Sequence, residues 1–583
     1  MHSKLHNLRM VYPVLLLVAC TAGNNPFPSD PKLRIHDIQG CSHSSPFIGQ
    51  EVNGITGIVT KKEGQGFFIQ DDQPDEKDCS SEAIYIYTGN YQKVLPGDFV
   101  SIDGTVNEFF SGIPDDHNLS RTEIKLKDIK IISRNHALPD YVTIPEDRNQ
   151  MPDRIIDDDQ NQIFDPDQDG LDFYESLESM LVRVSAGRVV GPGNPYNEFV
   201  LLPESYISNN IVSSEGALLM QEDDFNPERI ILRLNPQIEE KIPLGARLIE
   251  PVTGVFDYSY GNFKISVNGT IKIEPVTLDS IPLEKPKDGM TLVSLNVQNL
   301  SRFDDKSRFN RLAGMLVKDL DCPDIVVLHE VMDDSGLADD GNASSQLTVD
   351  KLVESIGKIG KIPYRSIYIS PQDNQDGGIE GGNIRSVILY RMDSEIQISS
   401  QIIDELAPNN PFRIGEEETI FFGARKPLLV LMEFEGHPFL LVAVHLTSHA
   451  ADSPLFGNQQ PVLKPEELQR VEQAKYINHY LESWQMENPD IPIILVGDLN
   501  DYPWSETLQA IKGNILIDGS EMIPPNERYS YILDGNAFQL DYVLASRIFA
   551  ANVKVILPHI NSSLDHSKQF SDHDPVYAEV GFP

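Results

Sequence analysis

The chain has 583 residues, which is too many for one hydrophobic core and predicts about two to four domains. Asp and Glu number 88 against 47 Lys and Arg, so the formal net charge is −41, and such a charge repels polyanions at long range. It excludes a protein that holds duplex nucleic acid tightly through a broad basic face, whereas nucleic acid bound at a local site with metal ions stays compatible with it.

The N-terminus is predicted to be a targeting segment rather than part of a domain. Lys4 and Arg9 precede an apolar run, Met10–Ala19, that is too short for a permanent transmembrane helix. The stretch Leu17-Val18-Ala19-Cys20 resembles the end of a bacterial lipoprotein signal, which implies a signal peptide over residues 1–20 and lipidation at Cys20. The alternative is an ordinary secretory signal with an incidental cysteine.

The same resemblance implies where the chain is exported. Thr21 after the cysteine favours the outer membrane or cell surface, with the periplasmic face left open. Residues 21–32 contain several prolines and predict a flexible tether. No other stretch is long and apolar enough to cross a membrane, so the mature chain is expected to contact the membrane only through its lipid anchor. The chain is expected to be a monomer.

The remaining cysteines would lie in an oxidising compartment. Cys41 and Cys79 fall in one small domain and are candidates for a disulfide. Cys322 precedes a buried strand and is expected to be a core thiol.

Residues 33–136 predict a small β-barrel of the OB type, because short strand-like runs recur about every ten residues between turn signals. The runs are Val52–Lys61, Gly66–Gln70, Ala83–Tyr87, Asp98–Val106 and Ile124–Ile132. The aromatic residues Phe67, Phe68, Tyr85 and Tyr87 are interpreted as core and cross-strand pairs. The alternative is a stacking platform for single strands or sugars.

Residues 137–282 predict a second β-rich module, most economically another OB-like barrel. Its strand-like runs are Leu181–Val190, Phe199–Leu202, Ile230–Leu234 and Arg247–Phe256. Asp165-Pro166-Asp167-Gln168-Asp169-Gly170 resembles the start of an EF-hand calcium loop, but that motif needs Glu at its twelfth position, where this chain has Ser176. The stretch is therefore interpreted as an acidic turn, with calcium binding as the alternative. Pro282, Pro286 and Gly289 mark a linker.

Residues 288–583 combine many strands with few helices. Helical spacing predicts helices over Ser307–Leu320 and Pro465–Trp484. Strands are expected at Thr291–Asn296, Asp324–Leu328, Arg385–Tyr390, Leu428–Phe434, Phe439–His445, Ile491–Val496, Leu540–Ala545 and from Val576 onward. This pattern predicts an α/β unit in which two packed sheets carry helices on the outside, and polar residues repeatedly follow the strand ends.

The stretch Gly497-Asp498-Leu499-Asn500-Asp501 is the most informative of these strand ends. It follows an apolar strand, and Asp498 and Asn500 are two positions apart, so on extended backbone they point to the same side. A carboxylate can orient or deprotonate a water, and an amide can donate to an oxyanion. Taken alone, the stretch is equally an Asx turn that caps a strand.

Eight fragments together resemble the endonuclease/exonuclease/phosphatase superfamily, of which deoxyribonuclease I is the best-known member. In the order of that family they are Leu295–Asn299, Leu328–Val331, Arg385–Tyr390, Arg425–Leu428, Val444–Ser448, Gly497–Asp501, Leu540–Leu544 and Ser571–Val576. The chain looks closest to large secreted or surface bacterial nucleases with N-terminal OB-like domains. The resemblance implies a four-layer α/β/β/α sandwich of two mixed sheets.

The resemblance also implies roles for the polar residues of these fragments. Glu330, with Asn296 and Asp572 beside it, is the implied ligand set for Mg²⁺, with Mn²⁺ or Ca²⁺ as alternatives. His573 and Asp541 match a pair in which the carboxylate fixes the tautomer of the imidazole and supports its charge.

The remaining implied roles concern water and phosphate. Asp498 matches the carboxylate that orients water, Asn500 its partner toward the phosphate, and His445 a donor to a phosphate oxygen or the leaving group. Arg385 and Arg425 are candidate phosphate clamps, since a guanidinium can hold two oxygens. For Arg425 a surface ion pair with Glu433 is the alternative. His329 and His449 are left open between a structural role and contact with substrate or metal.

These residues predict a metal-dependent nuclease that degrades extracellular DNA, and RNA as a further substrate, by in-line attack of an activated water. A phosphodiesterase or phosphatase for a small phosphoester, such as a phospholipid headgroup or an inositol phosphate, is the alternative within enzymes. The acidic balance fits that alternative somewhat better. A binding lipoprotein with an inactive nuclease-like domain is the alternative outside enzymes.

Overall fold

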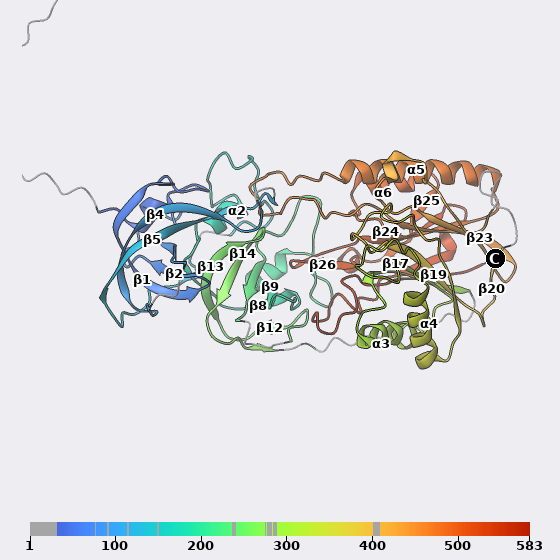
Figure 1. Ribbon diagram of the computed structural model, residues 1–583, viewed down its shortest axis with the longest axis horizontal. Coiled ribbons are helices and arrows are strands. Elements are labelled where there is room, and N and C mark those ends of the chain that lie inside the picture. The colour runs from blue at the N-terminus through green and yellow to red at the C-terminus, as the bar shows by residue number, and fades with distance from the viewer. Residues whose placement is uncertain are drawn as a thin grey trace, which may run out of the picture.

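The structure is a computed structural model that describes residues 32–582, apart from 76, 90–92, 114–115, 149–150, 236–240, 275, 277–282, 284–288 and 400–408. The predicted signal peptide, Cys20 and nearly all of the tether lie outside the described residues. Figure 1 shows the described chain as three units along its long axis: a barrel, a middle β-rich unit and a larger α/β unit. No helix of the described part combines the length and apolarity needed to cross a membrane.

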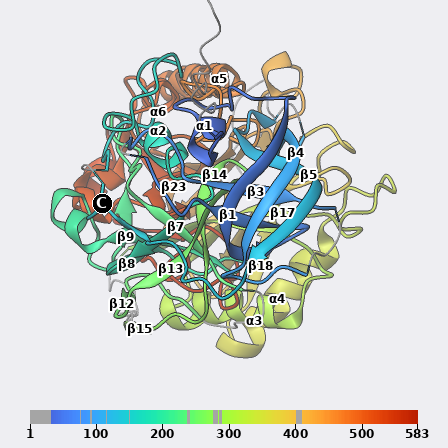
Figure 2. The same ribbon diagram turned by 90° about the vertical axis from the view of Figure 1, so that its left-hand side faces the viewer.

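The first unit is a closed five-stranded barrel in the order β1-β2-β3-β5-β4. The strands are β1 (Glu51–Glu63), β2 (Gly66–Gln70), β3 (Ala83–Tyr87), β4 (Phe99–Phe110) and β5 (Ser120–Ser133). Figure 2 shows β1, β3, β4 and β5 of this barrel on the side that faces the viewer. Along β4 buried and half-buried side chains alternate, as a strand with one face on a core requires. The short helix α1 (Ile35–Gln39) adds Ile35 and Ile38 to that core. The structure therefore confirms the first OB-like barrel.

The aromatic residues of the barrel are packing residues, as interpreted. Phe67, Phe68 and Tyr85 are buried, and the rings of Phe68 and Tyr85 meet edge to face at 4.9 Å between centroids. Tyr87 is half-buried beside them. Little aromatic surface is left there for stacking on a ligand.

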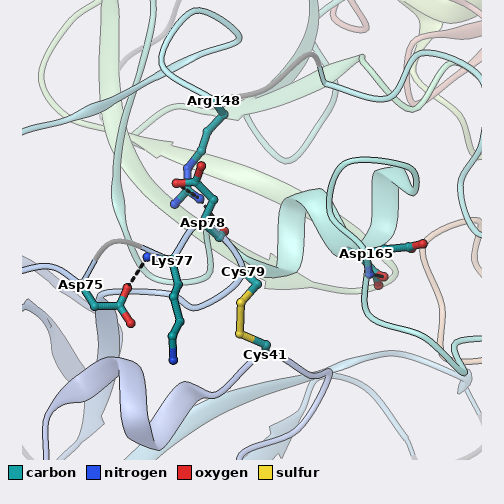
Figure 3. The surroundings of a disulfide bond; sticks show 8 residues. Cys41, Asp75, Lys77, Asp78, Cys79, Arg148 and Asp165 are labelled. Atoms are coloured by element: carbon teal, nitrogen blue, oxygen red, sulfur yellow. Dashed lines mark hydrogen bonds and ion pairs between the residues drawn. A yellow bond between two sulfur atoms is a disulfide. The ribbon is translucent and has the colours of Figure 1, made fainter.

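The predicted disulfide between Cys41 and Cys79 is present and closes the loop that carries β1 and β2 (Figure 3). Arg148 and Asp78 form an ion pair of 2.9 Å next to it, so the bridge also lies against the start of the middle unit. Cys322 is buried, and its thiol contacts the carbonyl of Val317.

The middle unit is β-rich, but its described strands do not close into a second barrel. They form a nine-stranded sheet in the order β15-β12-β8-β9-β11-β14-β13-β7-β6. The elements are β6 (Val142–Ile144), α2 (Gly170–Glu175), β7 (Leu181–Val184), β8 (Gly187–Gly191), β9 (Glu198–Pro203), β11 (Ile230–Arg233), β12 (Arg247–Leu248), β13 (Val252–Ser259), β14 (Asn262–Val267) and β15 (Ile273–Glu274).

Two of the strands expected in this unit are each two strands in the structure. The run Leu181–Val190 breaks before Gly187, and the run Arg247–Phe256 breaks at Pro251. β6 adds parallel to β7 at one edge, and β15 adds to β12 at the other, so the two edges of the sheet do not meet.

The third unit contains two sheets that pack face to face, with helices outside both. One sheet has the order β18-β19-β17-β16-β30-β29 and the other β20-β22-β23-β24-β28-β25, with β21 (Phe412–Arg413) beside β22. The strands of the first sheet are β16 (Met290–Leu300), β17 (Ile325–Val331), β18 (Tyr364–Ile367), β19 (Arg385–Arg391), β29 (Val553–Ile556) and β30 (Val576–Val580). Those of the second are β20 (Ile396–Ile398), β22 (Leu428–Phe434), β23 (His437–His445), β24 (Ile493–Asp498), β25 (Leu516–Asp518) and β28 (Asp541–Ser546).

The helices cover the outer faces, as Figure 1 shows. α3 (Lys306–Gly314) and α4 (Gln346–Gly360) pack on the first sheet, and α5 (Glu467–Glu487) and α6 (Glu506–Lys512) on the second. A separate apolar core fills the space between the sheets. This is the expected four-layer sandwich. The helix expected to reach Leu320 ends as an α-helix at Gly314 and continues as a π-helical turn, and α4 was not predicted.

A small shared sheet joins the middle unit to the third unit. Strand β10 (Leu218–Leu219) runs parallel to β27 (Asn536–Phe538), which pairs with β26 (Tyr531–Leu533). The Asn226 amide nitrogen donates to Asn536 Oδ1 across this contact at 2.7 Å. The middle unit is therefore held against the hairpin of β26 and β27, which contains Tyr531.

Candidate active site

The candidate active site lies where strands of the two facing sheets end. β23 and β24 run parallel, and their register pairs His445 with Asp498, while antiparallel β28 pairs Asp541 with Asp498. These three side chains thus stand in one row across the second sheet. Asn296 on β16 and Glu330 on β17 come from the first sheet. The fragments that are scattered through the sequence therefore converge.

Local backbone conformation directs these side chains into the space between the sheets. Glu330 has a φ of +63°, at a bulge where the pairing of β17 with β19 shifts register. Asn500 has a φ of +49° just after β24. Gly497 has a φ of +149°, and a Cβ there would lie 1.8 Å from the carbonyl oxygen of Val444. Such conformations are costly for most residues and concentrate at functional sites.

Asn296 links the carboxylates of the two sheets. Its amide nitrogen donates to Glu330 Oε1 and to Asp498 Oδ2, each at 3.0 Å. Its Oδ1 accepts from the backbone nitrogen of Gln298 at 2.9 Å. Asn296 was predicted as a metal ligand, whereas here its oxygen faces its own loop and its nitrogen holds two acidic groups together.

His573 and Asp541 form the expected pair. Nδ1 of His573 donates to Asp541 Oδ2 at 2.7 Å, and the hydroxyl of Ser530 donates to the same oxygen at 2.7 Å. Burial disfavours the charged imidazole, but Asp541, Asp498 and Asp572 outweigh it and hold the pKa of His573 well above its ordinary value. The imidazole is therefore a cation at neutral pH.

Asp498 is the carboxylate in the middle of the site. Its Oδ2 is 4.0 Å from Nε2 of His573 and 3.6 Å from Nε2 of His445. Burial raises the pKa of Asp498 to about 6, against the charge of His573. Its Oδ1 accepts from the backbone nitrogen of Asn500 at 2.8 Å. A carboxylate in this position can accept a proton near neutral pH.

His445 and Asn500 complete the group. His445 Nε2 lies 3.8 Å from Glu330 Oε1, and burial together with Arg425 holds its pKa well below the usual value, so the ring is a neutral donor. The amide nitrogen of Asn500 donates to the carbonyl of Leu446 at 3.2 Å.

The two predicted phosphate clamps are buried and differ in their relation to the site. Arg425 donates to the Leu446 carbonyl. Burial lowers the pKa of its guanidinium, and the negative charges of Glu330 and Asp498 oppose this effect. Arg425 does not pair with Glu433. Arg385 donates to the carbonyls of Ala343 and Asn383, so the contacts of its guanidinium fasten loops and do not reach the catalytic carboxylates.

The two histidines left open by the sequence make no hydrogen bond to the catalytic carboxylates, although the ring of His329 meets the ring of His445 edge to face at 5.9 Å between centroids. His329 is fully buried between the hydroxyls of Ser294 and Ser386, and burial lowers its pKa to about 3. It is a neutral packing residue. Nδ1 of His449 forms a hydrogen bond with Oδ2 of Asp452 at 2.8 Å, and both residues line a different cavity.

Sequence reasoning missed Ser530 and Tyr531. Ser530 supports Asp541, and the ring of Tyr531 lies 4.7 Å from the ring of His573. Backbone bridging between Tyr531 and His573 brings them together. No local pattern marks either residue, because both acquire their place from a long-range contact.

A cavity of about 970 Å³ between the middle and third units lies beside the site, and Asp572 and Tyr531 line it. Asp572, Ser571 and Gln298 line its catalytic side, and the middle unit contributes the exposed rings of Tyr196 and Tyr260. Lys264 and Arg308 also line it, but Glu198 and Asp304 pair with them at 2.8 and 2.6 Å. The cavity is thus open and has little unpaired positive charge.

The donor set fits a hard divalent cation. Burial raises the pKa of Glu330, the charge of Asp572 adds to this effect, and Asn296, His573 and Arg425 oppose it. Ligand atoms of Asp498, Asp541 and His573 also lie within 4.8 Å of one another, but the cationic imidazole already occupies the place between these two aspartates, which leaves Glu330 and Asp572 for a metal ion. Several carboxylates with few cations between them favour a bound Mg²⁺-like ion, which prefers oxygen ligands.

Comparison with known families supports this geometry. The Endonuclease/Exonuclease/phosphatase family matches residues 293–573, and a domain of unknown function (DUF8508) matches residues 143–275. No curated protein matches the chain in sequence. The family match confirms the expected superfamily and with it phosphoester hydrolysis as the class of reaction.

Solved structures similar to this chain cover about half of it. Truncated TDP2 from Caenorhabditis elegans is 17% identical over 50% of this chain and 98% of that chain, with a TM-score of 0.34. TDP2 from D. rerio complexed with single strand DNA product is 15% identical over 50% and 99%, with a TM-score of 0.34. A mannosyl-6-phosphatase from Bacteroides thetaiotaomicron is 18% identical over 50% and 100%, with a TM-score of 0.33.

Proposed function

Because residues 293–573 belong to the Endonuclease/Exonuclease/phosphatase family, we propose that the protein is a divalent-metal-dependent nuclease that cleaves DNA, and RNA as a further substrate. The observation that carries this proposal is that Asn296 joins Glu330 to Asp498, and that the pair of His573 and Asp541 lies beside Asp498.

The roles follow from charge and position. Glu330 and Asp572 would hold a cation such as Mg²⁺, which neutralises phosphate charge when bound. Asp498 orients a water molecule and accepts its proton, because burial raises its pKa to about 6. His573, kept cationic by Asp541, stabilises the negative charge that develops on the phosphate oxygens. His445, a neutral imidazole, donates a hydrogen bond from Nε2 to a phosphate oxygen or the leaving group.

The open cavity supports a chain-like substrate. Tyr196 and Tyr260 are 76% and 71% exposed, and exposed aromatic rings stack on unpaired bases of any sequence. The scarcity of unpaired positive charge favours single strands or short segments over long duplexes. The same scarcity supports the second candidate, hydrolysis of a small phosphoester.

The test is hydrolysis of plasmid DNA, a labelled single-stranded oligonucleotide, RNA and inositol phosphates or sphingomyelin, with Mg²⁺, Mn²⁺, Ca²⁺ or EDTA. We expect cleavage of nucleic acid that EDTA abolishes, and a loss of about 100-fold or more in Glu330→Gln. Hydrolysis of only the small phosphoesters would favour the second candidate. Absence of activity on every phosphoester would favour the binding lipoprotein.

We also propose that the chain is exported and held at the outer membrane or cell surface by a lipid on Cys20. The support is the sequence of the signal segment. A Cys20→Ala protein should appear in the soluble fraction, and its continued partition with membranes would contradict the anchor.

A further inference from the structure

A cluster of aspartates lies in the middle unit, outside the candidate active site. Ligand atoms of Asp157, Asp159 and Asp169 lie within 4.8 Å of one another, and so do those of Asp165, Asp169 and Asp172. Asp169 is common to both groups. The cluster therefore gathers two segments of the loop between β6 and α2 around one carboxylate.

Asp169 is unusual because it is buried without a partner. It is 0% exposed, and neither of its carboxylate oxygens has a hydrogen-bond donor. Oδ1 of Asp165 is also buried without a donor. By contrast, the buried Asp324 accepts from Thr291, and the buried Asp574 accepts from Asn561 and Ser562. A buried, unpaired carboxylate is strongly unfavourable unless a proton or a cation compensates it.

No side-chain cation of the described chain supplies that compensation. Among the described residues, no Lys or Arg forms an ion pair with Asp157, Asp159, Asp165 or Asp169. The one basic contact of the cluster is Nε2 of His43 on Asp172.

The loop is folded so that the carboxylates stay together. Asp157 accepts from the backbone nitrogens of Gln160 and Asn161, and Asp159 from those of Gln162 and Ile163. Asp172 Oδ2 accepts from the backbone nitrogen of Asp165 at 2.7 Å. Each of these oxygens keeps a further lone pair that can bind a cation.

We propose that Asp157, Asp159, Asp165, Asp169 and Asp172 form a Ca²⁺ site that is separate from the catalytic centre. All of its donors are oxygens, which suits a hard cation. A loop that gathers several carboxylates fits Ca²⁺, which accepts about six to eight oxygens in variable geometry, better than Mg²⁺, which demands a near-ideal octahedron.

The site differs from an EF-hand, which explains why the sequence pattern was incomplete. The position where an EF-hand needs Glu is Ser176, the residue after α2. Here Asp157 and Asp159, which precede Asp165 in the chain, supply the additional oxygens. The ligands thus come from both sides of the motif.

Calcium at this place would order a contact with the catalytic unit. The amide nitrogen of Asn161 donates to the Asn458 carbonyl of that unit at 3.1 Å. Asp157 also lines a cavity of about 930 Å³ together with His449 and Tyr502. The cation is therefore expected to stabilise the junction of the two units.

The test compares the full chain and Asp169→Asn by thermal unfolding and calorimetric titration with CaCl₂ after removal of metals by EGTA. We expect Ca²⁺ to raise the Tm of the wild type by several degrees and to leave Asp169→Asn unchanged. In EGTA the Tm of the variant should equal or exceed that of the wild type, because a buried negative charge has been removed. The proposal would be overturned if the Tm of the variant were lower than that of the wild type by the same amount with Ca²⁺ and in EGTA.

Two controls separate this site from the catalytic centre and from general destabilisation. In Glu330→Gln the Ca²⁺-dependent rise in Tm should persist, and its disappearance would assign the effect to the catalytic centre. Asp324→Asn, at a buried and satisfied aspartate, should lower Tm but keep the response to Ca²⁺. If Asp169→Asn does not fold, Asp159→Asn should weaken Ca²⁺ binding by at least tenfold, and unchanged affinity would refute the site.

Discussion

Replacing Asp541 by Asn tests whether the charge of this residue controls His573. Asp541 is fully buried, and Oδ2 accepts hydrogen bonds from His573 and Ser530, each at 2.7 Å. The substitution keeps the shape of the side chain and removes its charge. Without the charge of Asp541, the burial of His573, which disfavours the charged imidazole, is opposed less strongly, so the pKa of His573 should fall.

The size of the effect follows from the hydrogen bond that is weakened. Hydrogen bonds to charged groups contribute about 1.5–3 kcal/mol, and each 1.4 kcal/mol corresponds to about a tenfold change in rate. We therefore expect kcat/KM to fall by about 10- to 150-fold. The assay is cleavage of a labelled single-stranded oligonucleotide at saturating Mg²⁺ between about pH 5.5 and 8.5.

The pH dependence and a matched control give the refuting result. The ratio of variant to wild-type activity should decrease as pH rises, because the unsupported imidazole loses its proton earlier. Asp324 is also buried and accepts from Thr291 at 2.8 Å, but it lies just before β17, at the opposite end of that strand from Glu330. Asp324→Asn should lower Tm without changing kcat/KM. Equal, pH-independent losses in both variants would show that Asp541 has no catalytic role.

Three further predictions follow from charges and cross-links. The pKa of Asp498 is raised to about 6, so kcat/KM should fall about tenfold per pH unit below that value as the carboxylate is protonated; activity constant down to pH 5 would contradict this role. Burial raises the pKa of Glu228 to about 8, so the folded state binds a proton that the unfolded state releases. The free energy of unfolding in urea should therefore rise as pH falls from about 8 to about 6, by up to about 1.4 kcal/mol per pH unit for this group, and Glu228→Gln should flatten the slope. Cys41 and Cys79 are 38 residues apart, so reduction of their bridge should lower stability by about 4 kcal/mol, and an unchanged Tm in dithiothreitol would refute this estimate.

Local patterns in the sequence predicted the strands and the polar residues at their ends. The barrel strands alternate buried and half-buried side chains, and the apolar runs before Asp498 and Glu330 end where polar groups begin. Such short-range patterns survive in a linear chain because each strand must present its own apolar face. The family resemblance added the order of the fragments, and the convergence of Asn296, Glu330, Asp498 and His573 agrees with it.

Other features depended on contacts between distant segments. Arg385 was a candidate clamp by its place in a fragment, but its guanidinium fastens the Ala343 and Asn383 carbonyls. Asn296 turned its nitrogen to the carboxylates because Gln298 takes its oxygen. The middle unit did not close as a barrel, because additional edge strands separate its ends.

The sequence by itself determined that the C-terminal half of the chain is rich in strands and carries acidic, amide and imidazole groups at the strand ends, which suit a metal and a phosphoester. Only the tertiary structure decided which groups share a site, which are neutral, and that Asp169 lies buried without a donor. The physical reason is that burial and neighbouring charges set protonation and partnership, and both arise only when segments hundreds of residues apart pack together.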